Sequence, residues 1–504
     1  MICEVLQRAV RGRRKIVAAA TIGVLTLFGT DPRQAAALGP RRPNIVFILT
    51  DNTGWGDWGP YGGGAMRGAA SPNVDRLAAE GMRLENFNTE PQCTPSRSAI
   101  MTGRFAVRSG TQSIPIGTNL YGLVPWEITI ADSLSTAGYA TAAFGKWHLG
   151  QTAGRFPTDH GFDQWYGIPN TSDESTWLSP EVEQVNSIPA DIHIAPERAP
   201  YILASGRGEV PHRVKLYDIE ARKTIDRDLT QQAVSYIAQH ARERQPFFVY
   251  LALTATHYPS VPSREFAGSS GHGDYADMLV QTDFYLGQVM NALKAAKVDQ
   301  DTIVVFCSDN GAEDPAVGNG QYNGWTGPWR GSYFTAMEGG LRAPFIIRWP
   351  GHVPQGAVSN KIVHDADIFP TLADWAGAKV PDDRPIDGID MVKFFQGQSV
   401  ESGRDGFPVF VGNDLRAVKW RDWKWHLAWQ VFKTDPVQPF STAPRVIDLT
   451  RDPREERYAT EPYNTWLQFP VTQLIADFRN SVARFPNVPV GAPDTYRPQP
   501  SVAK

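Results

Sequence analysis

The stretch PNIVFILTDN (residues 43–52) is a continuous run of apolar and β-branched side chains that stops at a polar end. Such a run predicts a strand that is buried on both faces, as in a parallel sheet. Two later stretches have the same pattern, PFFVYLAL (246–253) and TIVVFC (302–307). Helical patterns precede them at 229–242 and 275–296, and strands that alternate with helices indicate an α/β fold. We therefore expect a large mixed, mostly parallel sheet sandwiched by helices.

Polar residues follow each of these strands. Asp51 and Asn52 follow the first run, His257 comes shortly after the second, and Asp309 and Asn310 come just after the third. Because ligands of open α/β sheets bind beyond the carboxyl ends of the strands, we expect Asp51, His257 and Asp309 to meet at one edge. Each Asp-Asn pair taken alone is also typical of a turn. Together the two pairs offer two carboxylates and two amide oxygens, a donor set that suits Ca²⁺ or Mg²⁺.

The chain has 504 residues, of which 42% are hydrophobic, so it is long enough for more than one packed unit. We expect an α/β domain over 38–404, with a long loop-rich insertion at 168–215. From 405 to 504 the pattern indicates a small C-terminal α+β subdomain with an antiparallel sheet, followed by a tail. Its short strands are expected at 409–411, 416–420, 423–429 and 446–449, and its helix at 466–483.

Residues 1–37 have the pattern of a signal peptide. Basic residues gather at 8–15, a charge-free apolar run follows at 16–29, and Ala35 to Ala37 provide small residues for cleavage. A buried amphipathic helix is the alternative, but it leaves the basic cluster unexplained. The apolar run has 14 residues, fewer than the roughly 20 that span a bilayer. We therefore expect a periplasmic or secreted protein without a permanent membrane span, and both Sec and twin-arginine export stay open. The net charge of −4 gives no sign of nucleic-acid binding.

The stretch PQCTPSRSAIMTGR (residues 91–104) is the most specific in the chain. Thr94 is expected to cap a helix whose first residue is Pro95 and whose end is closed by Gly103. The positive end of that helix would lie directly beside the preceding cysteine.

Cys93 would then lie beside Arg97 at a helix start, a position that binds anions and activates a thiol. An incidental cysteine at the start of a helix is the alternative interpretation. Cys307 is the other cysteine outside the expected signal peptide, so the number of cysteines also allows a disulfide between Cys93 and Cys307.

The order Cys-x-Pro-Ser-Arg followed by Thr-Gly-Arg resembles the signature of the type I, formylglycine-dependent sulfatases, an arylsulfatase-like family of the alkaline-phosphatase-like superfamily. The resemblance extends from Pro43 to about Pro350 and is weaker through the C-terminal segment. The other stretches that carry it are PNIVFILTDNTGWG (43–56), GKWHLG (145–150), HGFD (160–163), THYP (256–259), SDNG (308–311) and EGGLRAP (338–344).

The resemblance implies that a maturation system oxidises Cys93 to formylglycine, whose hydrate attacks the sulfur of a sulfate ester and forms a sulfated enzyme. It implies that His257 protonates the departing alcohol or phenol. His148 would then take the proton of the second hydroxyl, so that sulfate leaves and the aldehyde returns. Arg97 and Lys146 would hold the sulfonyl oxygens and the diol by electrostatic attraction.

The resemblance also implies a divalent-cation site, for which Ca²⁺ is expected and Mg²⁺ is the alternative. Its ligands would be Asp51, Asn52, Asp309, Asn310 and the oxidised Cys93.

Two positions depart from the family pattern. The family often has Asp where this chain has Asn52, which leaves the metal site with one fewer negative charge. The family usually has Lys where this chain has Tyr333, whose phenol donates a hydrogen bond but stays neutral at pH 7. We treat Tyr333 as a substrate residue, and expect its contact with sulfate to be weaker or to be supplied elsewhere.

These features predict a sulfuric ester hydrolase that acts on a small-molecule or carbohydrate sulfate ester. A phosphonate monoester or phosphodiester hydrolase of the same superfamily is the nearest alternative, because its substrates are also tetrahedral oxyanions. A non-catalytic binder of sulfated glycans, with an unconverted Cys93, is the second alternative. The physiological substrate is not specified by the sequence.

Overall fold

The computed structural model describes residues 42–114, 120–178, 198–314, 324–440, 443–457, 459–460 and 464–499. The described residues belong to one compact unit, which begins at Arg42. The signal peptide expected at 1–37 lies outside the described residues. Among the helices that are described, none has the length and apolar character needed to cross a membrane.

The centre of the fold is four adjacent parallel strands, in the order β9 (Thr302–Ser308), β1 (Asn44–Thr50), β8 (Phe247–Ala252) and β4 (Ala140–Gly145). Every residue of these strands is buried, because helices cover both faces of the sheet. The three strands expected from their continuous apolar runs are therefore confirmed.

Six further strands complete a sheet of ten strands in the described part of the chain. β10 (Phe345–Arg348) is antiparallel to β9, and β6 (Tyr201–Gly206) is antiparallel to β5 (Gln164–Gly167), so the sheet is mixed, as expected. The remaining strands are β2 (Met82–Leu84), β7 (His212–Leu216) and β11 (Ala357–Ser359).

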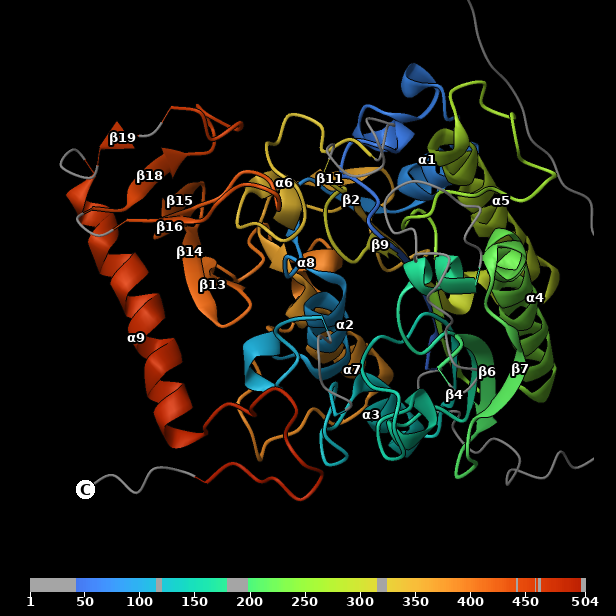
Figure 1. The fold of residues 1–504 in the computed structure, drawn as a ribbon. Helices are drawn as coiled ribbons and strands as arrows, with labels where there is room; N and C mark the ends of the chain where they lie inside the picture. The colour runs from blue at the N-terminus through green and yellow to red at the C-terminus, as the bar shows by residue number, and fades with distance from the viewer. Residues whose placement is uncertain are drawn as a thin grey trace, which may run out of the picture. The chain divides into compact units, whose positions relative to one another are not determined.

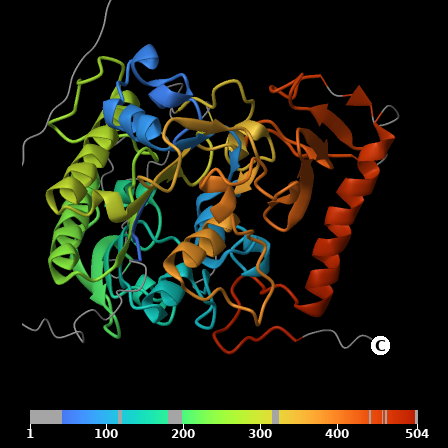
Figure 2. The same ribbon diagram turned by 180° about the vertical axis from the view of Figure 1, so that it is seen from behind.

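Alternate side chains of β1 enter two different hydrophobic cores. Ile45, Phe47 and Leu49 pack on one side of the sheet, and Val46 and Ile48 pack on the other. The first core is covered by α2 (Cys93–Thr102), α3 (Ile130–Thr136), α7 (Ile368–Ala376) and α8 (Val392–Phe395). The second is covered by α1 (Pro72–Glu80), α4 (Ile219–Glu243) and α5 (Asp274–Ala295), and Figures 1 and 2 show these helices on opposite sides of the sheet.

Both expected helices are present, but α4 begins ten residues before the expected start at 229. The carboxylate of Asp218 caps its start by accepting a hydrogen bond from the backbone N–H of Ala221 at 2.8 Å. Apart from Ile219, Ala221 and Ile225, the additional turns carry polar and charged side chains, two of which (Arg222 and Asp226) are buried, and this weakens the apolar periodicity by which helices are recognised in a sequence.

The expectation of a loop-rich insertion at 168–215 was wrong for its second half. β6 and β7 lie in this segment and extend the main sheet to its edge. β7 reads HRVKL and is almost entirely exposed, so it has no apolar run that would predict a strand. A short 3₁₀ helix at Ser172–Leu178 precedes residues 179–197, which are outside the described residues.

The expected small antiparallel sheet is present in the C-terminal segment. Its strands are β13 (Gly406–Val411), β14 (Asp414–Trp420), β15 (Trp423–His426), β18 (Arg445–Asp448) and β19 (Ala459–Thr460). The helix α9 (Gln468–Arg484) packs Val471 against Val418, Trp425 and Val446 of this sheet. The run expected as one strand at 423–429 is divided, because Ala428–Trp429 (β16) pairs instead with Gln438–Pro439 (β17). Two short strands, β3 (Phe87–Asn88) and β12 (Val363–His364), pair separately.

A buried cluster of charges joins the two sheets. Glu338, in α6 (Glu338–Leu341), accepts hydrogen bonds from Lys419 of β14 at 2.6 Å and from Lys424 of β15 at 2.9 Å, and it also pairs with Arg342. Burial alone would raise the pKa of Glu338, but the charges of Lys419, Lys424 and Arg342 hold it well below its ordinary value. The C-terminal sheet is thus fixed to the α/β unit by ion pairs that are shielded from water.

We predict that Glu338→Gln destabilises the protein by about 3–5 kcal/mol, because it leaves buried cations without their anion. Urea unfolding measures this difference. The pKa of Glu338 is depressed in the folded state, so its contribution is present above its ordinary pKa of 4.5 and decreases as the pH falls below that value. The matched control is Glu401→Gln, which breaks an exposed pair with Lys361 and should cost no more than about 1 kcal/mol. Equal costs for the two variants would contradict this interpretation.

Candidate active site

The site lies at the carboxyl ends of the four central strands. Asp51 and Asn52 follow β1, Asp309 follows β9, Lys146 follows β4 and His257 comes soon after β8. Hydrogen bonds between neighbouring segments fix this edge: the N–H of Asp51 donates to the Ala255 carbonyl at 2.8 Å, and that of Asp309 donates to the Thr50 carbonyl at 3.1 Å. The topology therefore brings Asp51, His257 and Asp309 to one edge, as the sequence predicts.

The helix α2 brings Cys93 to this edge, but it begins one residue before Thr94. Gln92 occupies the cap position, so the predictions of Thr94 as the cap and of Pro95 as the first helical residue were wrong. The Thr94 hydroxyl instead donates a hydrogen bond to the His148 carbonyl at 2.9 Å and ties the helix to the β4 loop. Gly103 closes the helix with a φ of 67°, as predicted.

Two buried ion pairs surround Cys93. Arg97 donates from Nε and Nη2 to one oxygen of Asp309, at 3.0 and 2.7 Å, and Lys146 donates to Asp51 at 2.7 Å. All four side chains are inaccessible to water. Burial raises the pKa of Asp51, but the charges of Lys146, His257 and Arg97 outweigh it and hold that pKa well below its ordinary value.

The thiol of Cys93 is buried, with its sulfur 3.4 Å from Oδ1 of Asp51 and 3.7 Å from Oδ1 of Asn52. Burial raises the pKa of this thiol well above its ordinary value, in spite of Lys146 and Arg97. The sequence-based expectation of an activated thiol was therefore wrong. Cys307 is buried in β9 and is also free, so the two cysteines form no disulfide.

The side chains at this edge offer donors for a cation. Oxygen, sulfur and nitrogen atoms of Asp51, Cys93 and His257 lie within 4.8 Å of one another. Nδ2 of Asn310 donates to Oδ1 of Asn52 at 2.7 Å, while its buried Oδ1 has no hydrogen-bond partner among the described residues. A buried amide oxygen without a partner, beside carboxylates, fits a hard divalent cation.

The two histidines have different environments. His148 is buried, and its pKa is lowered well below its ordinary value by burial and by the charges of Lys146 and Arg97, so the ring is neutral. Nδ1 of His257 lies 2.7 Å from the Tyr258 carbonyl, to which only a protonated nitrogen can donate. This contact directs Nε2 of His257 away from the backbone, where it lies 3.3 Å from the Thr171 hydroxyl.

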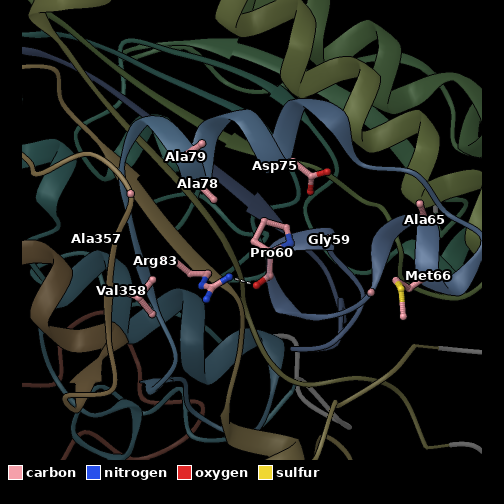
Figure 3. A pocket seen from close by; sticks show the side chains of 12 residues that line it. Gly59, Pro60, Ala65, Met66, Asp75, Ala78, Ala79, Arg83, Ala357 and Val358 are labelled. Atoms are coloured by element: carbon pink, nitrogen blue, oxygen red, sulfur yellow. Dashed lines mark hydrogen bonds between the residues drawn. The ribbon is translucent and has the colours of Figure 1, made fainter.

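A cavity of about 1160 Å³, lined by polar and apolar side chains alike, opens over Cys93, His148, His257 and Tyr333. Its outer wall includes residues that the sequence did not single out, because they belong to no motif: Asp173, Glu174, Trp177, Arg198, Tyr201 and Arg213. Burial raises the pKa of Glu174 to about 8. A smaller cavity of about 480 Å³, seen in Figure 3 beside Pro60, Asp75 and Arg83, contains none of the expected catalytic residues.

Sequence reasoning also missed Glu313 and Lys433. Nζ of Lys433 donates to Oε1 of Glu313 at 2.6 Å and to the Tyr333 hydroxyl at 2.9 Å. Glu313 lies only three residues after Asn310, and this spacing was the one available signal. Lys433 has no motif around it and reaches the site only through the fold.

Comparisons with known proteins identify relatives over most of the chain. The family model described as Sulfatase matches residues 43–378. The N-acetylgalactosamine-6-sulfatase of Rattus norvegicus is 33% identical over 89% of this chain and 87% of its own length. The arylsulfatase D of Homo sapiens is 31% identical over 86% of this chain and 85% of its own. The crystal structure of the PsFucS1 sulfatase from Pseudoalteromonas sp. superimposes with a TM-score of 0.81 and 30% identity, over 89% of this chain and 92% of that one.

Proposed function

Because this chain belongs to the sulfatase family and is a sulfuric ester hydrolase, we propose that residue 93 is oxidised to formylglycine and supplies the nucleophile. The observation that carries this proposal is the position of Cys93 at the inner end of a large cavity, between two cation–carboxylate pairs and two histidines. The sulfur of Cys93 stands here for an oxygen of the oxidised residue. The proposal implies a formylglycine-generating maturation system that oxidises Cys93; burial raises the pKa of the unmodified thiol, which keeps it in its less nucleophilic protonated form.

We propose Asp51, Asn52, Asp309 and Asn310 as ligands of a Ca²⁺ ion, with Mg²⁺ as the alternative. The oxygen donors and the unpaired amide oxygen of Asn310 support this assignment. A bound dication would act as a Lewis acid toward the oxygens of residue 93 and of the sulfate group.

The other side chains around residue 93 have separate roles in binding the sulfate group and in proton transfer. Arg97 and Lys146 balance the carboxylates and present positive charge to the sulfonyl oxygens. His257, with Nδ1 held by the Tyr258 carbonyl, would deliver a proton from Nε2 to the departing oxygen. His148 would accept a proton from residue 93, because its neighbours keep it neutral.

The substrate that we propose is a sulfated carbohydrate. The cavity is large, and its wall includes acidic, basic and aromatic side chains that can bind sugar hydroxyls and rings. The name of the N-acetylgalactosamine-6-sulfatase relative supports the same class of substrate. We further propose that residues 1–37 direct export to the periplasm or medium, that 38–404 carry catalysis and that 405–504 support it.

We predict that Cys93→Ser lowers kcat by about 10⁴-fold or more, as removal of a covalent nucleophile does. A serine sulfate carries no second hydroxyl on the same carbon, so sulfated serine is expected to accumulate in the peptide that contains residue 93. Turnover of nitrophenyl sulfate and peptide mass spectrometry measure these effects. Cys307→Ala is the control, since it removes the other buried thiol and should retain turnover. Normal multiple turnover by Cys93→Ser would refute the assignment.

We predict that chelation inactivates the enzyme reversibly and that Asp309→Ala weakens cation binding, because it removes a charged ligand. Adding CaCl₂ or MgCl₂ to chelated protein should raise the Tm of the wild type but not that of Asp309→Ala. Asp382→Ala, which removes an exposed carboxylate, should behave like the wild type. Full activity of metal-stripped protein would contradict the proposed role of the cation.

We predict that substitution of the two histidines has different effects on the rate. His257→Ala should lose about 10²- to 10⁴-fold in rate on an alkyl or sugar sulfate, and much less on nitrophenyl sulfate, because a nitrophenolate leaves without a proton. His148→Ala should lose a similar factor on both, since it acts after the leaving group has gone. A series of substrates with different leaving groups measures this. If the rates of the two variants depended equally on the leaving group, the roles assigned to His257 and His148 would be contradicted.

A further inference from the structure

The ion pair between Glu313 and Lys433 connects Asn52 with Tyr333, and Tyr333 lines the catalytic cavity. One oxygen of Glu313 accepts from Lys433 at 2.6 Å, and the other lies 3.5 Å from Nδ2 of Asn52. The same Lys433 ammonium donates to the hydroxyl of Tyr333 at 2.9 Å. Contacts thus run from Asn52 in the loop after β1 to Tyr333 in the cavity wall, through one anion and one cation.

Lys433 comes from the C-terminal segment, between β16 and β17. Its ammonium lies over the rings of Tyr333 and Phe334, 4.6 and 5.8 Å from their centroids, which holds it by cation–π attraction as well as by the ion pair. Its side chain is only 24% exposed and that of Glu313 only 7%, so solvent screens the pair weakly. The cation is therefore fixed beside the phenol.

We propose that Lys433 is a positioning residue for the sulfate group: it binds the phenol oxygen of Tyr333 and so directs the phenol proton to a sulfate oxygen in the cavity. The proposal rests on the sulfatase function proposed above and extends it to the anchoring of the anion. Lys433 acts through Tyr333, because Tyr333 lines the cavity with Cys93 and His257 whereas Lys433 does not.

The chemistry of the phenol supports this role. Burial, followed by the charge of Glu313, raises the pKa of Tyr333 well above its ordinary value, so the hydroxyl keeps its proton and can donate it. Its oxygen accepts from Lys433, so the phenol proton points away from that ammonium, either toward Glu313 or toward an anion in the cavity.

Glu313 is the competing acceptor, since it also lies within hydrogen-bonding reach of the Tyr333 hydroxyl. By pairing with Glu313, Lys433 neutralises a carboxylate that would otherwise hold the phenol proton and repel an incoming anion. The Lys433 ammonium therefore weakens Glu313 as an acceptor of the phenol proton and polarises the Tyr333 hydroxyl as a donor. Loss of the Lys433 charge should weaken sulfate binding without removing any group that takes part in the chemical steps.

The test is Lys433→Met, which keeps the length and apolar stem of the side chain and removes its charge. We expect about a tenfold rise in KM for nitrophenyl sulfate and in the inhibition constant of inorganic sulfate, with little change in kcat. Lys433→Arg should keep most of the wild-type affinity for substrate and sulfate. Lys361→Met, which breaks the exposed ion pair with Glu401, should have no effect on either constant. If Lys433→Met does not fold, Lys433→Gln takes its place with the same expected loss.

A double-mutant cycle separates positioning from a purely structural role. Tyr333→Phe should raise the same two constants, and in that background Lys433→Met should add little further loss. Two results would overturn the inference: full additivity of the two substitutions, or an unchanged inhibition constant of sulfate in Lys433→Met. In either case, an active wild type would leave the sulfatase proposal intact. A wild type that carries formylglycine and does not hydrolyse nitrophenyl sulfate or a sugar sulfate would overturn both.

Discussion

Two buried carboxylates at the ends of adjacent strands impose the constraint on which this site depends. Asp51 and Asp309 follow β1 and β9, which are paired in register up to Thr50 and Ser308. Water does not reach either carboxylate, and a buried charge without a partner costs several kcal/mol. Arg97 from α2 and Lys146 from the end of β4 supply the balancing charges. The helix that carries Cys93 is therefore held at the strand ends by the ion pair of Arg97 with Asp309, beside the two cations that we propose as partners of the sulfate group.

Much of this arrangement could be predicted from the sequence, because it follows from local patterns. Continuous apolar runs identified β1, β8 and β9, and the polar residues after them converge because the strands are parallel. The signature around Cys93 identified the helix but not its cap, since the Thr94 hydroxyl is taken by the distant carbonyl of His148. The prediction of an activated thiol at Cys93 was also wrong. Burial raises the pKa of this thiol more than the neighbouring cations lower it, and the sequence does not show how deeply a side chain is buried.

The parts that could not be predicted depend on contacts between distant segments. β7 is an exposed edge strand without an apolar pattern, yet it extends the main sheet. Lys433 and Glu313 are 120 residues apart and meet only after the C-terminal segment has packed on the α/β unit. Glu338, paired with Lys419 and Lys424, fixes that segment in place. The C-terminal segment thus has two functions: its sheet is fixed to the α/β unit by Glu338, and the loop between β16 and β17, as we infer, brings the positive charge of Lys433 to Tyr333 in the cavity wall.

The central claim is that residue 93 acts as a formylglycine and not as a thiol. The most direct measurement is the mass of the peptide that contains residue 93, from protein produced with and without a formylglycine-generating maturation system and assayed in parallel on nitrophenyl sulfate. We expect turnover to rise in proportion to the fraction of peptide that is lighter by the difference between a thiol and an aldehyde. Full turnover by protein in which residue 93 is entirely an unmodified cysteine would contradict the claim.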